Sequence, residues 1–373
     1  MKRFLFMSAL ASVALASCVN DEAMENTSKA SDQKITFNAP VVSGTTRAIA
    51  GEQPGIDGKY KTDEHFKVYA CWSNNVYSTW DANNIYMNGV EVAYDNSGSW
   101  NSESVSGGTT YYWPKTGYLT FAAYSPATAG GTISYGGTGL SITGFEVESN
   151  TSDQYDLMYS ERSYNRTASI GGQSYSGVDI WFKHALSSIK FMVKQKEAYT
   201  GTTIKLTGLT IQNAYSKGNF VQGLSDGAAA KEGNSAWTNQ GTETHYSVWN
   251  STDGQALTTA LTEPNDIHDI ILLPQNFVHQ VSGGDDKVVS IKVDYTIQNG
   301  SGPVLPQTAT LPLAVKNASG DYLYYYENNN EIMQDWEMGK RYTYNITIGL
   351  DKIYFSPEVV DWVDVTVTPD LTI

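Results

Sequence analysis

The sequence predicts an all-β protein built from two antiparallel β-sandwich domains of about 150 to 190 residues each. Three observations carry this prediction. Apolar residues recur with a period of two, paired glycines separate these segments, and only 17% of the 373 residues are charged. Apolar side chains at alternate positions share one face of a pleated strand and leave the other face to water. Alternating strands divided by tight turns are typical of sandwiches rather than of βαβ units.

The alternation is clearest in four segments, beginning with the first predicted strand at 35–41. The apolar set of that strand is Ile35, Phe37, Ala39 and Val41, and the other three sets are Ile189, Phe191 and Val193; Ile291, Val293, Tyr295 and Ile297; and Tyr342, Tyr344, Ile346 and Ile348. Glycine pairs at 107–108, 130–131, 136–137, 171–172 and 283–284 indicate turns between strands. The one helical candidate, 330–337, is short, and we expect a single turn there.

The length of the chain allows two ordinary domains, and no internal repeat is evident. A stretch rich in glycine, serine and tyrosine at 163–177 is the natural place to divide them. We therefore expect an N-terminal sandwich over 35–180 and a C-terminal sandwich over 181–373.

Cys18 and its flanks predict an exported lipoprotein. Lys2 and Arg3 precede an uncharged apolar run at 4–16, which is too short to cross about 30 Å of hydrocarbon. The sequence Leu15-Ala16-Ser17-Cys18 is a lipobox, in which cleavage before the cysteine leaves a thiol that can be diacylated. In this interpretation, 1–17 is a signal peptide that directs export to the bacterial outer membrane or cell surface. The polar stretch 18–34 is a flexible spacer between that membrane and the folded domains. The alternative is an ordinary signal peptide that ends near a cysteine.

Net charge and cysteine content exclude several classes of partner. Removal of 1–17 takes away Lys2 and Arg3 and leaves 22 basic against 39 acidic side chains, a net charge of −17. Such a chain repels phosphate backbones and anionic lipid, so nucleic-acid binding is not expected and membrane association must come from acyl chains. Cys71 is the only other cysteine. We therefore expect no intramolecular disulfide and a small apolar strand residue at 71.

No catalytic motif is present, so we expect no enzyme activity, no catalytic residues, no cofactor and no metal. The sequence lacks a His-Glu-x-x-His pair, a nucleophile elbow, a phosphate-binding glycine loop and an EF-hand loop. The five histidines are scattered without a cysteine or second histidine at ligand spacing. His184 lies near the predicted domain connection, where we expect its imidazole to play a structural role by hydrogen bonding to backbone.

Four tryptophans lie among serine, threonine, asparagine and aspartate in segments that resemble loops: Trp80, Trp100, Trp237 and Trp249. Exposed aromatic side chains in polar loops can stack on sugar rings or anchor a protein partner. The alternative is that they close the ends of the sandwich as core residues. Neighbouring residue types do not decide between these roles.

Arg47 lies in a small, polar, glycine-bearing stretch at 43–48 that follows the first predicted strand. Such a stretch is easily cleaved. A trypsin-like protease cutting between Arg47 and Ala48 would release the chain before Ala48, including the strand at 35–41. The alternative is an ordinary solvated arginine.

Taken together, these features resemble the fimbrillin family of Bacteroidetes, the pilin-like lipoproteins of type V pili. No single segment is decisive, and the order and spacing of the set carry the resemblance. The segments are Tyr111-Tyr112-Trp113-Pro114, Leu119 to Pro126, Asp156-Leu157-Met158-Tyr159, Phe182 to Ile189, Ile271-Leu272-Leu273-Pro274-Gln275 and Trp336 to Ile348.

The resemblance implies sandwiches of transthyretin-like topology, no enzymatic activity and other fimbrial subunits as partners. It also implies cleavage after an arginine at the place of Arg47, displacement of the strand at 35–41 and insertion of a neighbouring subunit's strand. A strand with an apolar face is suited to fill such a groove. Val363, Val365 and Val367 give the C-terminal segment 362–373 this pattern, as a donor or as the last strand of its own domain.

Two functions follow from the sequence. The first is a fimbrial subunit, tip or anchor protein that assembles on the bacterial surface by protease-triggered strand exchange and supports adhesion. The alternative is a surface lipoprotein that does not polymerise and binds glycans or host ligands through loop tryptophans.

Overall fold

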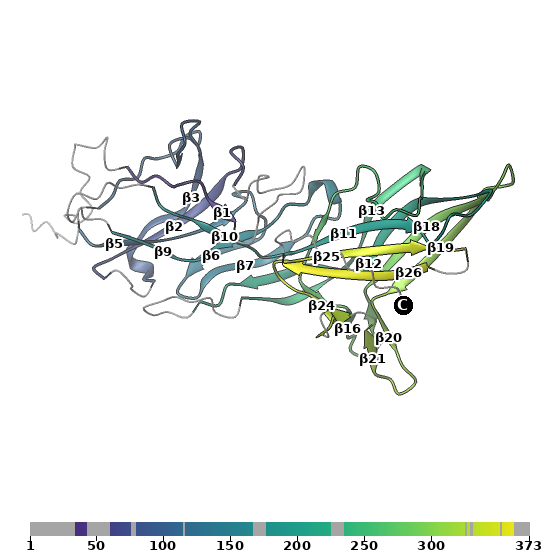
Figure 1. The fold of residues 1–373 in the computed structure, drawn as a ribbon. Helices are drawn as coiled ribbons and strands as arrows, with labels where there is room; N and C mark the ends of the chain where they lie inside the picture. Colours follow the sequence, from purple (N-terminus) through teal and green to yellow (C-terminus); the bar gives the residue numbers. More distant parts are fainter. Residues whose placement is uncertain are drawn as a thin grey trace, which may run out of the picture.

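The part of the chain that the structure describes is built mainly from β-strands joined by loops and turns. The computed structural model describes residues 34–42, 60–75, 80–114, 116–166, 177–224, 235–324, 327–328, 331–350 and 353–361. Within these residues the only helical elements are two 3-10 turns, η3 (Ala82–Asn84) and η4 (Thr151–Asp153). The all-β prediction is confirmed. The molecule is elongated, with the strands of the first half at one end and those of the second half at the other (Figure 1).

The largest sheet belongs to the N-terminal half of the chain. Its order is β1-β10-β8-β5-β2-β3-β4, and β9 also pairs with β5. All pairs are antiparallel except β1 with β10, which is parallel. The strands are β1 (Val41–Val42), β2 (Phe66–Ser73), β3 (Ile85–Tyr94), β4 (Trp100–Asn101), β5 (Tyr118–Ser125), β8 (Met158–Ser160), β9 (Ser163–Arg166) and β10 (Trp181–His184).

Both faces of β2 are buried, which explains its nearly continuous apolar sequence. Val68 and Ala70 lie in one hydrophobic cluster with the first residues of the described chain, a cluster called here the N-terminal core. Tyr69 and Cys71, on the opposite face, lie in a larger core shared with the later sheets. Cys71 is a buried free thiol whose pKa is raised by burial, so the prediction of a small apolar strand residue is confirmed.

A second sheet connects residues from both sides of position 180. Its order is β19-β18-β12-β7-β6, with β13 also paired to β12. The 20-residue β12 pairs with β18 near its beginning and with β7 near its end, and it runs along the middle of the molecule (Figure 1). The strands are β6 (Thr132–Gly136), β7 (Gly139–Glu146), β12 (Thr202–Val221), β13 (Ala236–Ala256), β18 (Ser290–Asn299) and β19 (Leu305–Pro312).

The third sheet contains two of the segments whose alternation was clearest in the sequence. Its order is β14 (Ile270–Leu272), β11 (Ser187–Gln195), β25 (Lys340–Ile348) and β26 (Ile353–Asp361). β11 and β25 pair in parallel along their whole length. The predicted inward positions on both strands are buried: Ile189, Phe191, Val193, Tyr342, Tyr344, Ile346 and Ile348.

Four two-stranded sheets complete the described fold, and two of them replace the helical turn expected at 330–337. That prediction is wrong because β24 (Asp335–Trp336) pairs with β15 (Gln275–Asn276), and the buried Trp336 ring donates its Nε1 hydrogen to Tyr344 Oη at 2.8 Å. The remaining pairs are β22 (Glu327–Asn328) with β23 (Glu331–Ile332), β16 (Val278–His279) with β17 (Lys287–Val288), and β20 (Ala314–Lys316) with β21 (Tyr322–Tyr324).

Candidate functional site

Residues 34–42, called here the N-terminal segment, are inserted between β4 and β10 at the edge of the N-terminal core. Phe37 exchanges two backbone hydrogen bonds with Trp100, at 2.8 and 3.1 Å. On the other side, the N–H of Asn38 donates to Val178 O at 3.0 Å and the N–H of Val41 to Ile180 O at 3.0 Å. The segment is thus hydrogen-bonded on both sides, as a strand inside a sheet is.

The predicted alternation holds for the first half of this segment and fails in the second half. Ile35 and Phe37 are buried, as expected, but Ala39 is exposed and Val41 is 37% exposed. Asn38 is also exposed, and its side-chain amide donates to Gly177 O and Asp179 Oδ1. Two exposed residues in succession shift the phase by one, so Pro40 and Val42 face inward instead of Ala39 and Val41.

Phe37 is the main side chain that ties the segment to the core. Its ring makes edge-to-face contacts with Phe66 and Phe121, with centroids 5.9 and 5.8 Å apart. Taking the segment away would expose these two rings and leave backbone groups of Trp100 and Val178 without partners. Unpaired strand edges and exposed apolar surface both favour the addition of another strand.

The predicted cleavage site, Arg47 and Ala48, lies outside the described residues, and so does the predicted lipidation site, Cys18. The described chain resumes at Tyr60, whose backbone N–H donates to Pro40 O at 3.3 Å. Residues 43–59 therefore leave and re-enter the fold at neighbouring points. A cut anywhere in 43–59 would leave residues 34–42 held by noncovalent contacts alone.

The predicted donor residues Val363, Val365 and Val367 also lie outside the described residues. The described chain ends with β26, which pairs antiparallel with β25 from Ile353 to Asp361 and is the last strand in its sheet order. The donor role of 362–373 therefore stays a prediction.

His184 lies in a buried side-chain hydrogen bond that the sequence did not indicate. Its Nδ1 lies 2.5 Å from Oδ2 of Asp156, and the side chains of both residues are buried. Burial raises the pKa of the Asp156 carboxyl, and the neighbouring His184 opposes this. We expected backbone to be the partner of the imidazole, whereas the structure places a carboxylate beside it. The pair ties β10 to the loop before β8.

Trp80 and Trp100 are buried, so the prediction that they contact a ligand from exposed loops is wrong. The Trp80 ring lies 4.6 Å from the Tyr135 ring, and the guanidinium of Arg162 lies 5.6 Å over it. Trp100 is only 1% exposed, between the N-terminal segment and β3. Both indoles face inward although their neighbours in sequence are polar, which is the alternative that the sequence left open.

Trp237 also packs against the core, although it is only half-buried. Its ring centroid lies 5.4 Å from those of both Phe145 and Phe220, and its Nε1 donates to Ala185 O at 2.6 Å. These contacts fit a packing role rather than the predicted ligand contact.

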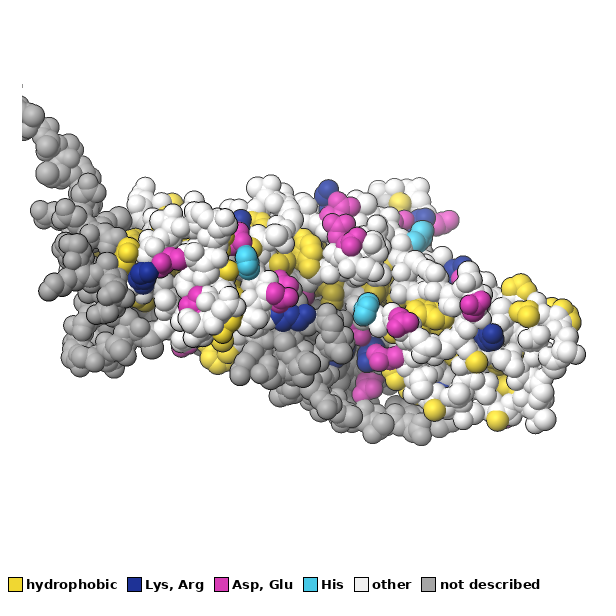
Figure 2. Space-filling view, turned by 90° about the horizontal axis from the view of Figure 1, so that it is seen from above, with side chains coloured by type: hydrophobic (Ala, Val, Ile, Leu, Met, Phe, Trp, Pro, Cys, Tyr) yellow, Lys and Arg dark blue, Asp and Glu magenta, His cyan; other side chains and the backbone are white. Residues whose placement is uncertain are grey.

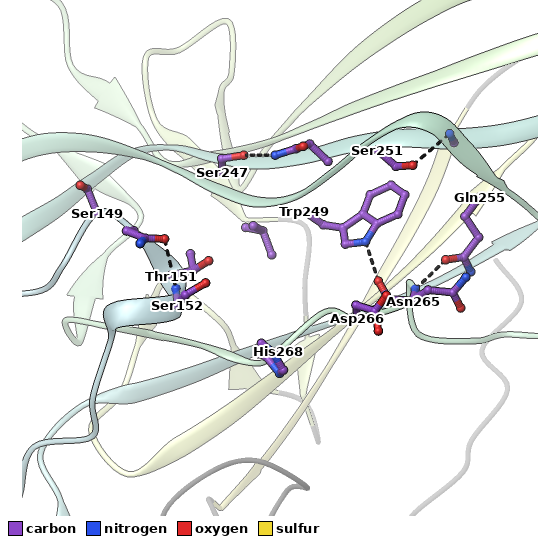
Figure 3. A pocket seen from close by; sticks show the side chains of 14 residues that line it. Ser149, Thr151, Ser152, Ser247, Trp249, Ser251, Gln255, Asn265, Asp266 and His268 are labelled. Atoms are coloured by element: carbon purple, nitrogen blue, oxygen red, sulfur yellow. Dashed lines mark hydrogen bonds between the residues drawn. The ribbon is translucent and has the colours of Figure 1, made fainter.

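Trp249, unlike Trp80 and Trp100, is not buried, and it lines a groove (Figure 3). The groove has a volume of about 610 Å³ and lies between the loop that leads into η4, the second half of β13 and the loop before β14. The lining side chains are mostly hydroxyls and amides. The residues labelled in Figure 3 are Ser149, Thr151, Ser152, Ser247, Trp249, Ser251, Gln255, Asn265, Asp266 and His268.

Among the described residues, no cluster of histidine, cysteine, aspartate and glutamate has the geometry of a metal site. No helix in the described part of the chain is long and apolar enough to cross a membrane. Figure 2 shows acidic and basic side chains interspersed over one face of the molecule, without an extended basic area on that face.

Comparison with known proteins gives one family. The family model described as fimbrillin-like matches residues 46–362. A fimbrial protein from Bacteroides vulgatus is 18% identical, with a TM-score of 0.47, over 88% of this chain and 99% of that one. The tip fimbrial protein Mfa3 from Porphyromonas gingivalis is 12% identical, with a TM-score of 0.36, over 80% and 94%. Among curated proteins, none matches the chain. Because the family model spans most of the sequence, this chain belongs to the fimbrillin-like family.

Proposed function

We propose that this chain is a fimbrial subunit of the bacterial cell surface that assembles with other subunits by strand exchange. The observation that carries the proposal is the N-terminal segment. It fills the N-terminal core, yet cleavage after Arg47 would leave it without a covalent link to the rest of the fold. Membership of the fimbrillin-like family supports a fimbrial role.

The energetics favour exchange over simple loss of the strand. Ile35, Phe37 and Val42 are buried, and burying side chains of this size stabilises a fold by roughly 1.5–3 kcal/mol each. A chain that lost them would also leave buried backbone groups unpaired, at about 1–3 kcal/mol for each group. A trimmed subunit therefore gains most when another strand with alternating apolar residues takes the vacated place. Residues 362–373 of a neighbouring subunit have that pattern, with Val363, Val365 and Val367.

In this proposal the lipid on Cys18 is a temporary tether. It carries the precursor to the outer membrane and leaves with the N-terminal segment when Arg47 is cleaved. A shaft or tip subunit would then begin at Ala48 in the mature fibre, whereas an anchor would keep acylated Cys18. Mass spectrometry of the N-terminus of the protein isolated from cells separates these roles.

The test is treatment of the purified chain with an arginine-specific protease, followed by mass spectrometry and size-exclusion chromatography. We expect a product that begins at Ala48 and forms oligomers. The matched control is Arg47→Lys, which keeps the charge but removes the cleavage site, and which should stay monomeric. Deletion of 362–373 should allow cleavage but prevent oligomers of the chain with itself. A trimmed chain that stays monomeric, alone and with other fimbrial subunits, would refute strand exchange.

A further inference from the structure

The groove around Trp249 is an open hollow lined mostly by polar side chains, with one aromatic ring among them. Its walls come from two regions about a hundred residues apart in the sequence, 149–152 on one side and 247–255 with 265–268 on the other. Its volume of about 610 Å³ lies within the range of small-molecule pockets, roughly 300–1,000 Å³.

Two irregularities in the pairing of β12 with β13 lie on either side of Trp249. Thr210 pairs with Ser247 but Leu209 pairs with Trp249, so Val248 is an extra residue in β13. Beyond Trp249, four residues of β13 separate the partner of Gly208 from that of Leu206. Bulges re-aim side chains and are frequent beside functional sites. Here the extra residue Val248, which is buried, and the neighbouring Trp249 both line the groove.

The indole of Trp249 is held in a fixed orientation. Its Nε1 donates to the backbone oxygen of Asn265 at 2.7 Å, and the ring also packs against the core. Asn265 is positioned in turn by its backbone N–H, which donates to Gln255 Oε1 at 2.6 Å. A preorganised aromatic ring loses little side-chain entropy on binding, so it can serve as a stacking platform.

The same groove holds polar side chains whose hydrogen-bonding groups the fold does not use. The side chains of Ser149, Thr151, Asp266 and His268 have no hydrogen-bond partner among the described residues, and all four line the groove. Asp266, with a φ of 57°, and His268 are exposed at its rim. An aromatic platform ringed by free hydroxyl, carboxylate and imidazole groups matches a ligand that has apolar C–H faces and hydroxyl edges.

Charge narrows the class of ligand. None of the lining residues is lysine or arginine, and Asp266 contributes a carboxylate. An anionic ligand would meet no compensating charge and would be repelled. We propose that the groove binds a neutral saccharide, with a sugar ring stacked on Trp249 and its hydroxyls bonded to Thr151, Asp266 and His268. The proposal does not depend on strand exchange.

The experiment uses the mature chain, produced with Cys18 replaced to avoid acylation, on an array of neutral, sialylated and sulfated glycans. Calorimetry then measures the affinity for the neutral glycans that bind. We expect Trp249→Ala to weaken this binding about tenfold or more. Trp249→Phe, which keeps an aromatic face, should retain part of it. Thr151→Ala should weaken it less than Trp249→Ala does.

Trp181→Ala is the matched control, because Trp181 is 54% exposed and does not line the groove. It should bind like the unmodified chain, and the melting temperatures of all variants should be compared so that unfolding is not mistaken for lost binding. The proposal would be overturned if no glycan on the array bound, if only acidic glycans bound, or if binding were unchanged in Trp249→Ala. The protease assay for oligomers is unaffected by any of these outcomes, so failure of one proposal is distinguishable from failure of the other.

Discussion

The ring of Phe37 stands edge-on to the ring of Phe121, with centroids 5.8 Å apart and an interplanar angle of 89°. This contact joins the N-terminal segment to β5, in the middle of the first sheet. The segment is therefore a structural part of the N-terminal core, and any mechanism that removes it must replace what Phe37 contributes.

Phe37→Ala should destabilise the protein by about 3–5 kcal/mol, the usual cost of removing a buried phenylalanine side chain. It should also speed the loss of the N-terminal segment after cleavage, because fewer contacts retain it. Urea unfolding measures the first effect, and mass spectrometry of the trimmed chain over time measures the second. Ala39→Ser is the control, since Ala39 is exposed and should change the stability by no more than about 0.5 kcal/mol. Equal retention of the segment in both variants would contradict the role given to Phe37.

The buried Asp156 should make stability depend on pH. Burial raises its pKa, and the opposing effect of His184 does not cancel this. A carboxyl whose pKa is higher in the folded chain binds its proton more tightly there, so its contribution to stability is present at low pH and is lost as pH rises through the raised pKa. In Asp156→Asn the side chain cannot titrate. The free energy of unfolding of the unmodified chain minus that of the variant should therefore fall as pH rises above about 4, the ordinary pKa of an aspartate.

Asp294 provides a control of opposite sign for this titration. Although burial opposes it, hydrogen bonds from Lys292 and Thr308 lower the pKa of Asp294. Its contribution is therefore present above the ordinary pKa of an aspartate and is lost as pH falls. The same difference measured with Asp294→Asn should rise with pH. A difference that moves in the same direction for both variants would contradict the assignment.

Two ion pairs of different exposure should contribute very differently to stability. Arg341 Nε lies 3.0 Å from Asp269 Oδ2, with 7% and 2% of the two side chains exposed. Lys183 and Glu161 are 2.7 Å apart, with 27% and 48% exposed. Asp269→Ala leaves a buried guanidinium without this carboxylate and should cost about 3–5 kcal/mol. Glu161→Ala should cost about 1 kcal/mol or less. Urea unfolding of the two variants measures both changes in the free energy of unfolding. Equal changes would contradict the larger contribution expected of the buried pair.

The sequence correctly predicted which side chains face inward in strands whose alternation is unbroken. It did not do so where tertiary contacts change the phase of the alternation. Ile189, Phe191 and Val193 face inward as predicted. Ala39 and Val41 do not, because contacts of Asn38 with residues some 140 positions away shift the register. The parallel pairing of β11 with β25 could not be predicted from the sequence either, since alternation indicates a strand but not which strand lies beside it.

The residues of the groove could not be predicted from the sequence for a similar reason. Composition around Trp249 is compatible with a ligand contact, but it is equally compatible with one for Trp80 and Trp100, which are buried. Local residue types do not reveal which way an indole points. The other groove residues, Thr151, Asp266 and His268, were missed because the bulges of β13 and the path of two loops bring them together. No periodic pattern in the sequence encodes that approach.

Gly177 provides a sharp test of how the N-terminal segment is seated. A Cβ atom at this position would lie 2.8 Å from the backbone nitrogen of Asn38 and 2.9 Å from the carbonyl carbon of Phe37. These are backbone atoms, so the segment would have to move away from β10. We expect Gly177→Ala to weaken the hydrogen bonds of Asn38 to Val178 and Gly177, and to shorten the time for which the segment stays bound after cleavage.

The matched control for this substitution is Gly241→Ala, since a Cβ at Gly241 would meet nothing within 4 Å. Both variants lose the same backbone freedom in the unfolded chain, so the difference between them reports the steric contact alone. After treatment with the arginine-specific protease, Gly177→Ala should release the segment and form oligomers sooner than the unmodified chain, and Gly241→Ala should not. If Gly177→Ala released the segment faster without forming oligomers sooner, loss of the strand would not be the step that limits assembly. Capture of the incoming strand would then control the rate, and deletion of 362–373 should prevent assembly in both variants alike.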